Sequence, residues 1–309
     1  LDVTYYNANT LNQILNVTTP GSSGYERQLI NAGKMRSYGT EVSLTGTPIA
    51  TKDWNWDVTL NWGFNRTKCV ELDEQLKTFI IGETRIGKVV VNEGGKYGDI
   101  VALKHYERDD NGNILIGDNG MPIITSGEKK IGNMTPDWTG SFATTLRWKN
   151  LSLSALLDIR VGGDIISMTD AYATSHGTAE KTLEGRENGI VIPGINKETG
   201  TVNNTSVKPE DYWQVVGGGT GVAEEYMYDA SYIKFRELSL GYTLPQTWLR
   251  NLPISNVKLS FVGRDLFYIF KNAPVNPESA LGRQDYAQAF EYMALPSTRS
   301  FGFTLNVKF

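Results

Sequence analysis

The chain has 309 residues, a formal net charge of −4 and 40% hydrophobic residues, with a mean hydropathy of −0.31. The charge gives no reason to expect nucleic acid, the single cysteine, Cys69, excludes an internal disulfide framework, and no run approaches the ~18 consecutive apolar residues of a transmembrane helix. This composition suits a soluble protein, and equally a transmembrane β-barrel, because half of each barrel strand faces water and the loops are polar.

Alternation of apolar and polar residues predicts strands along the first half of the chain. Leu1 to Asn7 resembles the end of a strand, and Tyr38 to Thr45 alternates over its whole length. In Trp54 to Asn65, six apolar residues alternate with six polar or small ones. The pattern recurs from Trp138 to Trp148 and, two residues later, from Leu151 to Val161. A period of two predicts strands with one apolar and one polar side.

Three more strands are predicted in the last third of the chain. Tyr232 to Leu244 alternates, but its parity slips near Arg236 and Glu237, which predicts a β-bulge. Val257 to Phe261 opens another strand, and Phe301 to Phe309 alternates up to its aromatic end. Several of the eight strands reach about 12 residues, whereas soluble strands average about 5–6. Strands of about 9–11 residues are needed to cross a membrane, so strand length favours a transmembrane barrel.

Aromatic residues and link lengths support the same fold class. Trp54, Trp56 and Trp148 lie near one set of turns, and Trp138, Phe267 and Tyr268 near the other, as expected for two aromatic girdles. The short links are 49–53, 149–150 and 245–255, and the long links are 8–32, 70–136, 168–227 and 271–297. Barrels have short periplasmic turns and long extracellular loops. We predict an all-β, transmembrane antiparallel β-barrel with long extracellular loops.

No motif predicts a catalytic or metal site, and we expect neither an enzyme nor a bound cofactor. His105 and His176 have no second His or Cys at metal-ligand spacing. The run Asp109 to Asn113 lacks the glycine that a calcium loop needs at its sixth position. Asn111-Gly112 predicts a hairpin turn instead, with a loop calcium site as the alternative. Gly117 to Gly120 predicts a second turn.

Two groups of residues are candidates for contact with a transported ligand. Aromatic side chains in the loops can stack on sugars or pack against peptides, although loop packing explains them equally well. The candidates are Tyr172, Tyr212, Trp213 and Tyr286. Polar residues on the inward parity are expected to line the barrel lumen: Asn55, Asp57, Asn61, Arg147, Asp158 and Arg160. For any one of these, hydrogen bonding to other barrel residues is the commoner role.

Several motifs together resemble the SusC/RagA family of TonB-dependent outer-membrane transporters. The clearest are Ser231–Pro245 (SYIKFRELSLGYTLP), Val262–Phe267 (VGRDLF), Pro274–Glu278 (PVNPE) and Leu295–Phe301 (LPSTRSF). Asp265 replaces the family's usual Asn, and Asn276 its usual Asp. Upstream, the segments 132–138, 161–164, 31–33 and 39–41 also fit. The order and spacing of the motifs carry the resemblance over almost the whole chain.

The resemblance implies a twenty-two-stranded barrel around an N-terminal plug that carries a TonB box. Residues 1–309 would form its last eight strands, with the plug and the first strands outside this chain. Family members pair with a SusD-like surface lipoprotein, depend on TonB, and import glycans or peptides. The alternative is a self-contained eight-stranded outer-membrane barrel acting as an adhesin or enzyme. A soluble β-sandwich binding module fails on strand length and on the aromatic girdles.

Overall fold

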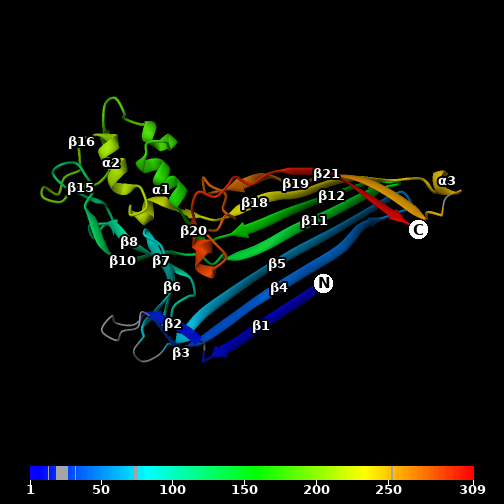
Figure 1. The fold of residues 1–309 in the computed structure, drawn as a ribbon, viewed down its shortest axis with the longest axis horizontal. Coiled ribbons are helices and arrows are strands. Elements are labelled where there is room, and N and C mark those ends of the chain that lie inside the picture. Colours follow the sequence, from blue (N-terminus) through cyan, green and yellow to red (C-terminus); the bar gives the residue numbers. More distant parts are fainter. Residues whose placement is uncertain (13, 19–26, 32, 73–75, 252) are drawn as a thin grey trace.

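The computed structural model describes residues 1–309 except 13, 19–26, 32, 73–75 and 252. Its main element is an eight-stranded sheet in which every strand pairs antiparallel with the next one in the order β1-β4-β5-β11-β12-β18-β19-β21 (Figure 1). The strands are β1 (Asp2–Leu11), β4 (Lys34–Ala50), β5 (Trp54–Glu71), β11 (Trp138–Trp148), β12 (Leu151–Val161), β18 (Tyr232–Thr243), β19 (Asn256–Lys271) and β21 (Ser300–Lys308).

All eight predicted strands are present, and the bounds of β11 and β12 agree with the prediction. Strands β4, β5 and β19, with 17, 18 and 16 residues, extend beyond their alternating segments and end within two residues of the predicted links. The residues beyond the alternating segments no longer alternate strictly between apolar and polar, but they continue the ladder. The predicted bulge is confirmed, because the register of β18 shifts at Arg236 against both β12 and β19.

The links between strands separate by length, as predicted. The short links β4–β5, β11–β12 and β18–β19 lie at one end of the long sheet, the last with the short helix α3 (Gln246–Leu249) (Figure 1). The long links lie at the other end. The first contains the hairpin of β2 (Ile14–Thr18) and β3 (Arg27–Asn31), and part of this predicted loop lies outside the described residues.

The other long links build a cap at the far end of the sheet. Strands β6 (Thr78–Glu83), β7 (Gly87–Asn92), β8 (Asp99–Tyr106) and β10 (Ile124–Asn133) form a four-stranded sheet. Strand β13 (Asp164–Ser167) lies between β17 (Met227–Asp229) and β20 (Phe290–Glu291). The helices are α1 (Met168–Ser175), α2 (Pro209–Val216), η2 (Glu180–Leu183), η3 (Ala223–Tyr226) and η4 (Asp285–Ala289). The short pairs are β14 (Ile190–Val191) with β16 (Ser206–Val207), and β9 (Leu115–Ile116) with β15 (Ile195–Asn196).

The fully buried apolar core belongs mainly to this cap. Ile100, Ile166, Tyr226 and Phe290 are completely buried and pack in one cluster. On the long sheet, large apolar side chains are exposed instead: Leu60 is 45% exposed and Leu240 52%. Because these side chains are exposed, the apolar side of the long sheet lacks a protein layer over it among the described residues.

No helix of the described residues is long and apolar enough to span a membrane.

Candidate functional site: the polar face of the long sheet

The pairing of the strands places the side chains of the long sheet on two chemically different faces. Residues directly opposite each other in neighbouring strands project to the same side. One such row is apolar in all six strands that it crosses: Trp56, Leu146, Leu153, Leu240, Phe261 and Phe303. The adjacent row is polar or small: Asn55, Arg147, Ser152, Gly241, Ser260 and Thr304. We name these surfaces the apolar face and the polar face.

The six predicted lumen-facing residues all lie on the polar face. Asn55 is opposite Arg147, while Asn61 and Asp158 are both opposite Ser141. The remaining two, Asp57 and Arg160, follow two residues further along the same strands as Asn55 and Asp158, and therefore project to the same side. The structure thus brings the six residues together as one surface.

Most of these side chains bond to neighbours along the sheet. Arg147 donates to Asn55 Oδ1 at 2.8 Å and pairs with Asp57 Oδ2 at 2.9 Å. Asn61 donates to Ser141 Oγ at 3.0 Å. Arg160, at the cap end, donates to the backbone oxygen of Met134 at 3.0 Å. A hydrogen-bonded polar surface of this kind can face water without unpaired groups.

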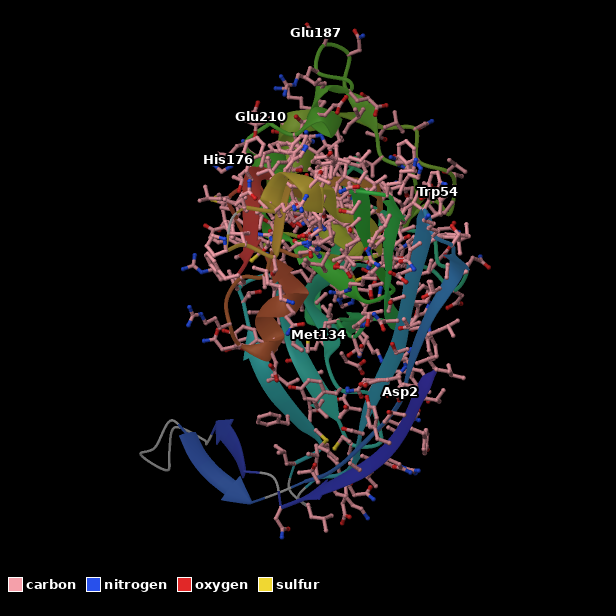
Figure 2. All side chains as sticks on the ribbon, turned by 90° about the vertical axis from the view of Figure 1, so that its right-hand side faces the viewer. Asp2, Trp54, Met134, His176, Glu187 and Glu210 are labelled. Carbon is pink, nitrogen blue, oxygen red and sulfur yellow. The ribbon has the colours of Figure 1, made fainter. Side chains whose placement is uncertain are left out.

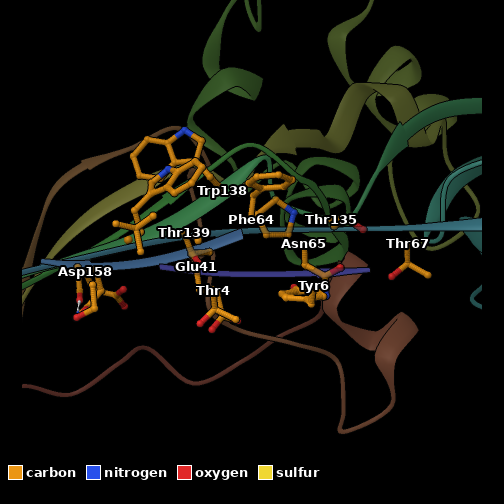
Figure 3. Close-up of a pocket in the computed structure, with 18 of the residues that line it drawn as sticks. Thr4, Tyr6, Glu41, Phe64, Asn65, Thr67, Thr135, Trp138, Thr139 and Asp158 are labelled. Carbon is orange, nitrogen blue, oxygen red and sulfur yellow. Dashed lines mark hydrogen bonds between the residues drawn. The ribbon is translucent and has the colours of Figure 1, made fainter. Parts of the chain in front are cut away.

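A groove of about 890 Å³ lies along this face, lined by β1, β4, β5 and β11 and by parts of the cap. Figure 3 shows Thr4, Glu41 and Asp158 on one side of the strands, and Phe64 and Trp138 on the other. The cap contributes Tyr97 and Asp285, and Tyr97 Oη donates to Asp285 Oδ2 at 3.2 Å. Burial, together with the nearby Asp285 charge, raises the pKa of Tyr97 to about 12, so the phenol stays protonated.

The groove is acidic. Its lining includes four carboxylates, from Asp2, Glu41, Asp158 and Asp285, and no Lys or Arg among the described residues. Hydroxyl and amide groups supply most of the remaining polar lining, for example from Ser43. Carboxylates and amide oxygens accept hydrogen bonds from hydroxyl or ammonium groups. The groove therefore suits a neutral or positively charged ligand better than an anion.

Beside the groove, five charged side chains form an ion-pair network on the polar face. Lys234 pairs with Asp265 at 2.9 Å and with Glu278 at 2.5 Å. Arg236 pairs with Asp265 at 3.0 Å, with Glu278 at 2.5 Å, and with Asp158. The network thus joins two cations to three carboxylates, and it connects β12, β18 and β19 with the link that follows β19. Lys234 is almost fully buried, at 3% exposed.

The bulge in β18 explains how this network forms. Lys234 is opposite Asp158, and Glu237 is opposite Leu156, so the bulged Arg236 is the extra residue between two ladder positions. Consecutive polar residues can then project from the same face, which alternation alone does not allow. Glu237 uses this position to accept from Arg264 Nε at 2.8 Å. The slip in parity seen in the sequence therefore marks the position of the network.

Glu278 anchors the long link between β19 and β21 to the sheet. Tyr268 Oη donates to Glu278 Oε2 at 2.8 Å and to Asn276 Oδ1 at 2.5 Å. Burial tends to raise the pKa of Glu278, but hydrogen bonds from Arg236, Lys234 and Tyr268 outweigh it and lower the pKa to about 2. The carboxylate is therefore charged over the physiological range. The network was missed as a unit in the sequence because its members come from separate motifs.

The aromatic girdles are confirmed with one correction. Trp54 and Trp148 are opposite each other near the short links and stack with ring centroids 5.7 Å apart. Phe267 stacks on Phe235 at 5.4 Å on the apolar face near the cap. Tyr268 does not belong to the girdle: it is opposite Lys234 on the polar face. Its hydrogen bonds to the link after β19 hold it there, and its neighbour Phe267 takes the outward position.

The predicted ligand-binding aromatics do not meet in one place. Tyr212 is buried, and its Oη lies 3.4 Å from that of Tyr106, so neither ring face is open to a ligand. Trp213 lines a separate cap cavity of about 750 Å³ with His176 and Glu210, and these two residues lie at the same side of the molecule in Figure 2. The other two make separate contacts within the cap. Tyr172 packs against Tyr292 and His176, and Tyr286 packs over Gly82.

The predicted turns form as expected. The Asp109 carboxylate accepts hydrogen bonds from the backbone of Asn111 and from both the backbone and the side chain of Asn113. Its oxygens are therefore engaged in stabilising the turn. Gly112 and Gly120 have φ of 85° and 77°, which favours glycine. Within the described part of the chain, no group of three or more His, Cys, Asp or Glu side chains is arranged to hold a metal ion.

Comparison with known proteins gives a consistent result. The family model for the TonB dependent receptor-like β-barrel matches residues 1–266. TonB-dependent receptor P3 of Formosa agariphila is 26% identical over 100% of this chain and 32% of its own length. TonB-dependent receptor SusC of Bacteroides thetaiotaomicron is 22% identical over 75% of this chain and 23% of its own length.

Solved structures share the fold. A structure of the RagAB peptide transporter superposes with a TM-score of 0.65 at 20% identity, covering 99% of this chain and 32% of that one. The RagAB peptide importer in a closed-closed state gives a TM-score of 0.67 at 21% identity, covering 99% and 33%. The chain thus spans about a third of the length of these relatives.

Proposed function

The chain belongs to the TonB dependent receptor-like β-barrel family, and from that premise we propose that it forms part of a transporter for active nutrient import across a bacterial outer membrane. The family and the fold make it an outer-membrane β-barrel with several membrane-crossing strands. Its relatives are receptors and transporters, and we propose no catalytic role. The activity of the whole protein also depends on segments that its relatives carry beyond the matched third.

The observation that supports this proposal best is the division of the long sheet into two faces. The apolar face matches the lipid-facing surface of a barrel. The polar face, with its hydrogen-bonded side chains and its groove, matches the inner wall of a barrel. A polar solute can pass along such a wall, and a plug domain can pack against it. Because the long links gather at the cap end, the cap is the extracellular end in this proposal.

We infer that the cargo is a neutral or positively charged oligosaccharide or peptide. The acidic groove supports this class, because its carboxylates would repel a polyanion and accept hydrogen bonds from sugar hydroxyls or peptide ammonium groups. The structural relatives include a peptide transporter, which agrees with the peptide option. A glycan remains equally compatible with the hydroxyl-rich and amide-rich lining.

A SusD-like surface lipoprotein is the proposed extracellular partner, and TonB the proposed energy-coupling partner. The resemblance to the SusC/RagA family supports both. In this arrangement the lipoprotein would close over the cap as a lid. TonB would act through a plug segment that the chain's own residues do not provide.

The alternative, a self-contained eight-stranded barrel acting as an adhesin or enzyme, is disfavoured by the sheet topology. The order of the sheet starts at β1 and ends at β21, and no ladder between these two strands occurs among the described residues. A closed barrel would need that pairing.

The proposal can be tested by native mass spectrometry of the protein extracted from outer membranes in detergent, combined with uptake assays. We expect a complex that contains further barrel segments and a lipoprotein, and uptake of labelled peptides or oligosaccharides that stops when the proton gradient is dissipated. A lone, fully folded 34.3 kDa chain without partners would contradict the transporter proposal. Uptake that persists without the gradient would contradict TonB dependence.

A further inference from the structure

A row of three basic residues crosses the sheet near the cap. Arg36 of β4 is directly opposite Lys68 of β5, and Lys68 is directly opposite Lys96. All three residues are exposed. Because residues that are opposite each other share a face, the three side chains project together. We name them the basic row.

The basic row belongs to the apolar face of the sheet. Along β5, Lys68 follows Trp62 and Phe64 at even spacing, so the three side chains project to the same side. Arg66 lies between Phe64 and Lys68 on this face and is opposite Tyr38. Moving toward the cap, the outward surface thus changes from aromatic to basic within a few residues.

The position of this change matches the edge of a membrane. Trp54 and Phe64 are ten residues apart on β5, which is about 34 Å along a strand. At a tilt of about 35–45° this distance covers about 24–28 Å, close to the apolar band of about 25 Å in outer-membrane barrels. Lys68 lies four residues beyond Phe64 on β5, which at the same tilt places the basic row about 10 Å outside that band. With the orientation given in the proposed function, on which this step rests, it lies among the headgroups of the outer leaflet.

The basic row is unfavourable unless an anion lies over it. Like charges directly opposite each other destabilise a sheet. Arg66 is neutralised by Asp137 at 2.7 Å, but among the described residues no carboxylate lies within ion-pair distance of Arg36, Lys68 or Lys96. Three carboxylates, those of Asp137, Asp164 and Asp229, do line the adjoining pocket of about 370 Å³, together with Lys68 and Lys96. Arg36 is oriented by Asn7, whose Oδ1 accepts from its Nε at 3.0 Å.

We propose that the basic row binds the phosphate groups of an anionic lipid in the outer leaflet, of the phosphorylated lipid A type. Arginine and lysine are the side chains that recognise phosphate, arginine through paired hydrogen bonds and lysine as a point charge. The acyl chains of such a lipid would cover the apolar face directly beside the row, at Trp62 and Phe64. One molecule would thereby satisfy the three charges and the apolar surface together.

The test uses the intact transporter and the triple variant Arg36→Gln, Lys68→Gln, Lys96→Gln, with lipid A as the probe in native mass spectrometry. We expect the variant to bind lipid A at least about tenfold more weakly than the wild type. Dephosphorylated lipid A should bind both proteins equally weakly, and inorganic phosphate should bind neither. Equal binding of lipid A by both proteins would overturn the proposal, and phosphate binding equal to that of lipid A would show a plain anion site.

Thermal unfolding in detergent separates the proposed role from a purely structural one. Without lipid, the triple variant should be at least as stable as the wild type, because repulsion within the basic row is removed. Added lipid A should raise the Tm of the wild type but not of the variant. The matched control removes three cations at the other end of the sheet, as Lys52→Gln, Lys149→Gln, Arg250→Gln, and should keep the lipid-dependent rise. Loss of that rise in the control would contradict the proposed location, whatever the outcome of the uptake assays.

Discussion

The guanidinium of Arg236 and the carboxylate of Glu278 meet on the polar face, with Nη2 2.5 Å from Oε1, although 42 residues separate them in the chain. Arg236 projects from the bulge of β18, and Glu278 belongs to the link that carries η4 back to the last strand. This pair fixes the link to the barrel wall. It thereby holds Asp285 in η4 at the groove.

Glu278→Gln should loosen the link between β19 and β21 without unfolding the barrel. The change removes one of three carboxylates from Lys234 and Arg236, which keep Asp158 and Asp265, so we expect a loss of about 1–3 kcal/mol in the free energy of unfolding. Hydrogen exchange measured by mass spectrometry should become faster in residues 279–289. Unchanged exchange in that segment would show that Glu278 does not anchor it.

Glu237→Gln is the matched control for that experiment. Glu237 lies on the same face of β18 as Arg236 and pairs with Arg264 of β19, but the side chains of Glu237 and Arg264 are 36% and 64% exposed. Exposed pairs contribute about 0–1 kcal/mol. We therefore expect little change in stability and none in the exchange of residues 279–289.

Acid should remove the contribution of Glu278. Its pKa in the folded protein, about 2, lies below the ordinary value of 4.5. A lowered pKa means that the stabilisation is complete above pH 4.5 and is lost as the pH falls toward 2. The difference in Tm between the wild type and Glu278→Gln should thus be constant from pH 7 to about pH 5 and shrink below it. A difference that grows on acidification would contradict the assigned ion pairs.

The apolar face can be tested by placing a charge on it. Leu60 and Phe142 are directly opposite each other, and Leu60→Arg or Phe142→Arg should cost about 2–4 kcal/mol near the bilayer midplane. Thr59→Arg and Thr145→Arg, on the polar face, should cost much less. Urea unfolding of the transporter in lipid vesicles measures all four variants. Equal costs on the two faces would show that the faces are assigned incorrectly.

Charge in the groove should select the cargo. Replacing Asp2 and Glu41 by Asn and Gln keeps the hydrogen-bond acceptors and removes two negative charges. We expect about tenfold weaker binding of a lysine-rich peptide, about 1.4 kcal/mol, and less than about threefold change for a neutral oligosaccharide. Calorimetric titration of the intact transporter gives both constants.

Two exposed acidic residues of the cap provide the control for the groove experiment. Asp110→Asn with Glu198→Gln removes the same charge outside the groove. This control should leave the binding of both ligands unchanged. Equal weakening by the two double variants would point to the net charge of the protein rather than to the groove.

The sequence alone determined the eight strands of the long sheet, their faces and the bulge, because each depends on a local pattern, whereas the strands of the cap were predicted only as long links. Alternation over 11 residues defined β11 and β12 to the residue, and the slip near Arg236 located the bulge. Local patterns also placed the six predicted lumen-facing residues on one side of the sheet. Alternation alone did not cover the ends of β4 or β5, which pairing stabilises, and the predicted links located those ends to within two residues.

The tertiary structure decided which side chains meet. Glu278 and Asp158 reach Arg236 from 42 and 78 residues away, and no periodicity within a strand relates them. The structure also placed Tyr268 on the polar face, where it donates to Glu278 of the following link, and Tyr212 inside the cap, where it meets Tyr106 from 106 residues away. Alternation shows to which side a residue projects. The register between strands and the path of the long links decide which side chains it contacts on that side.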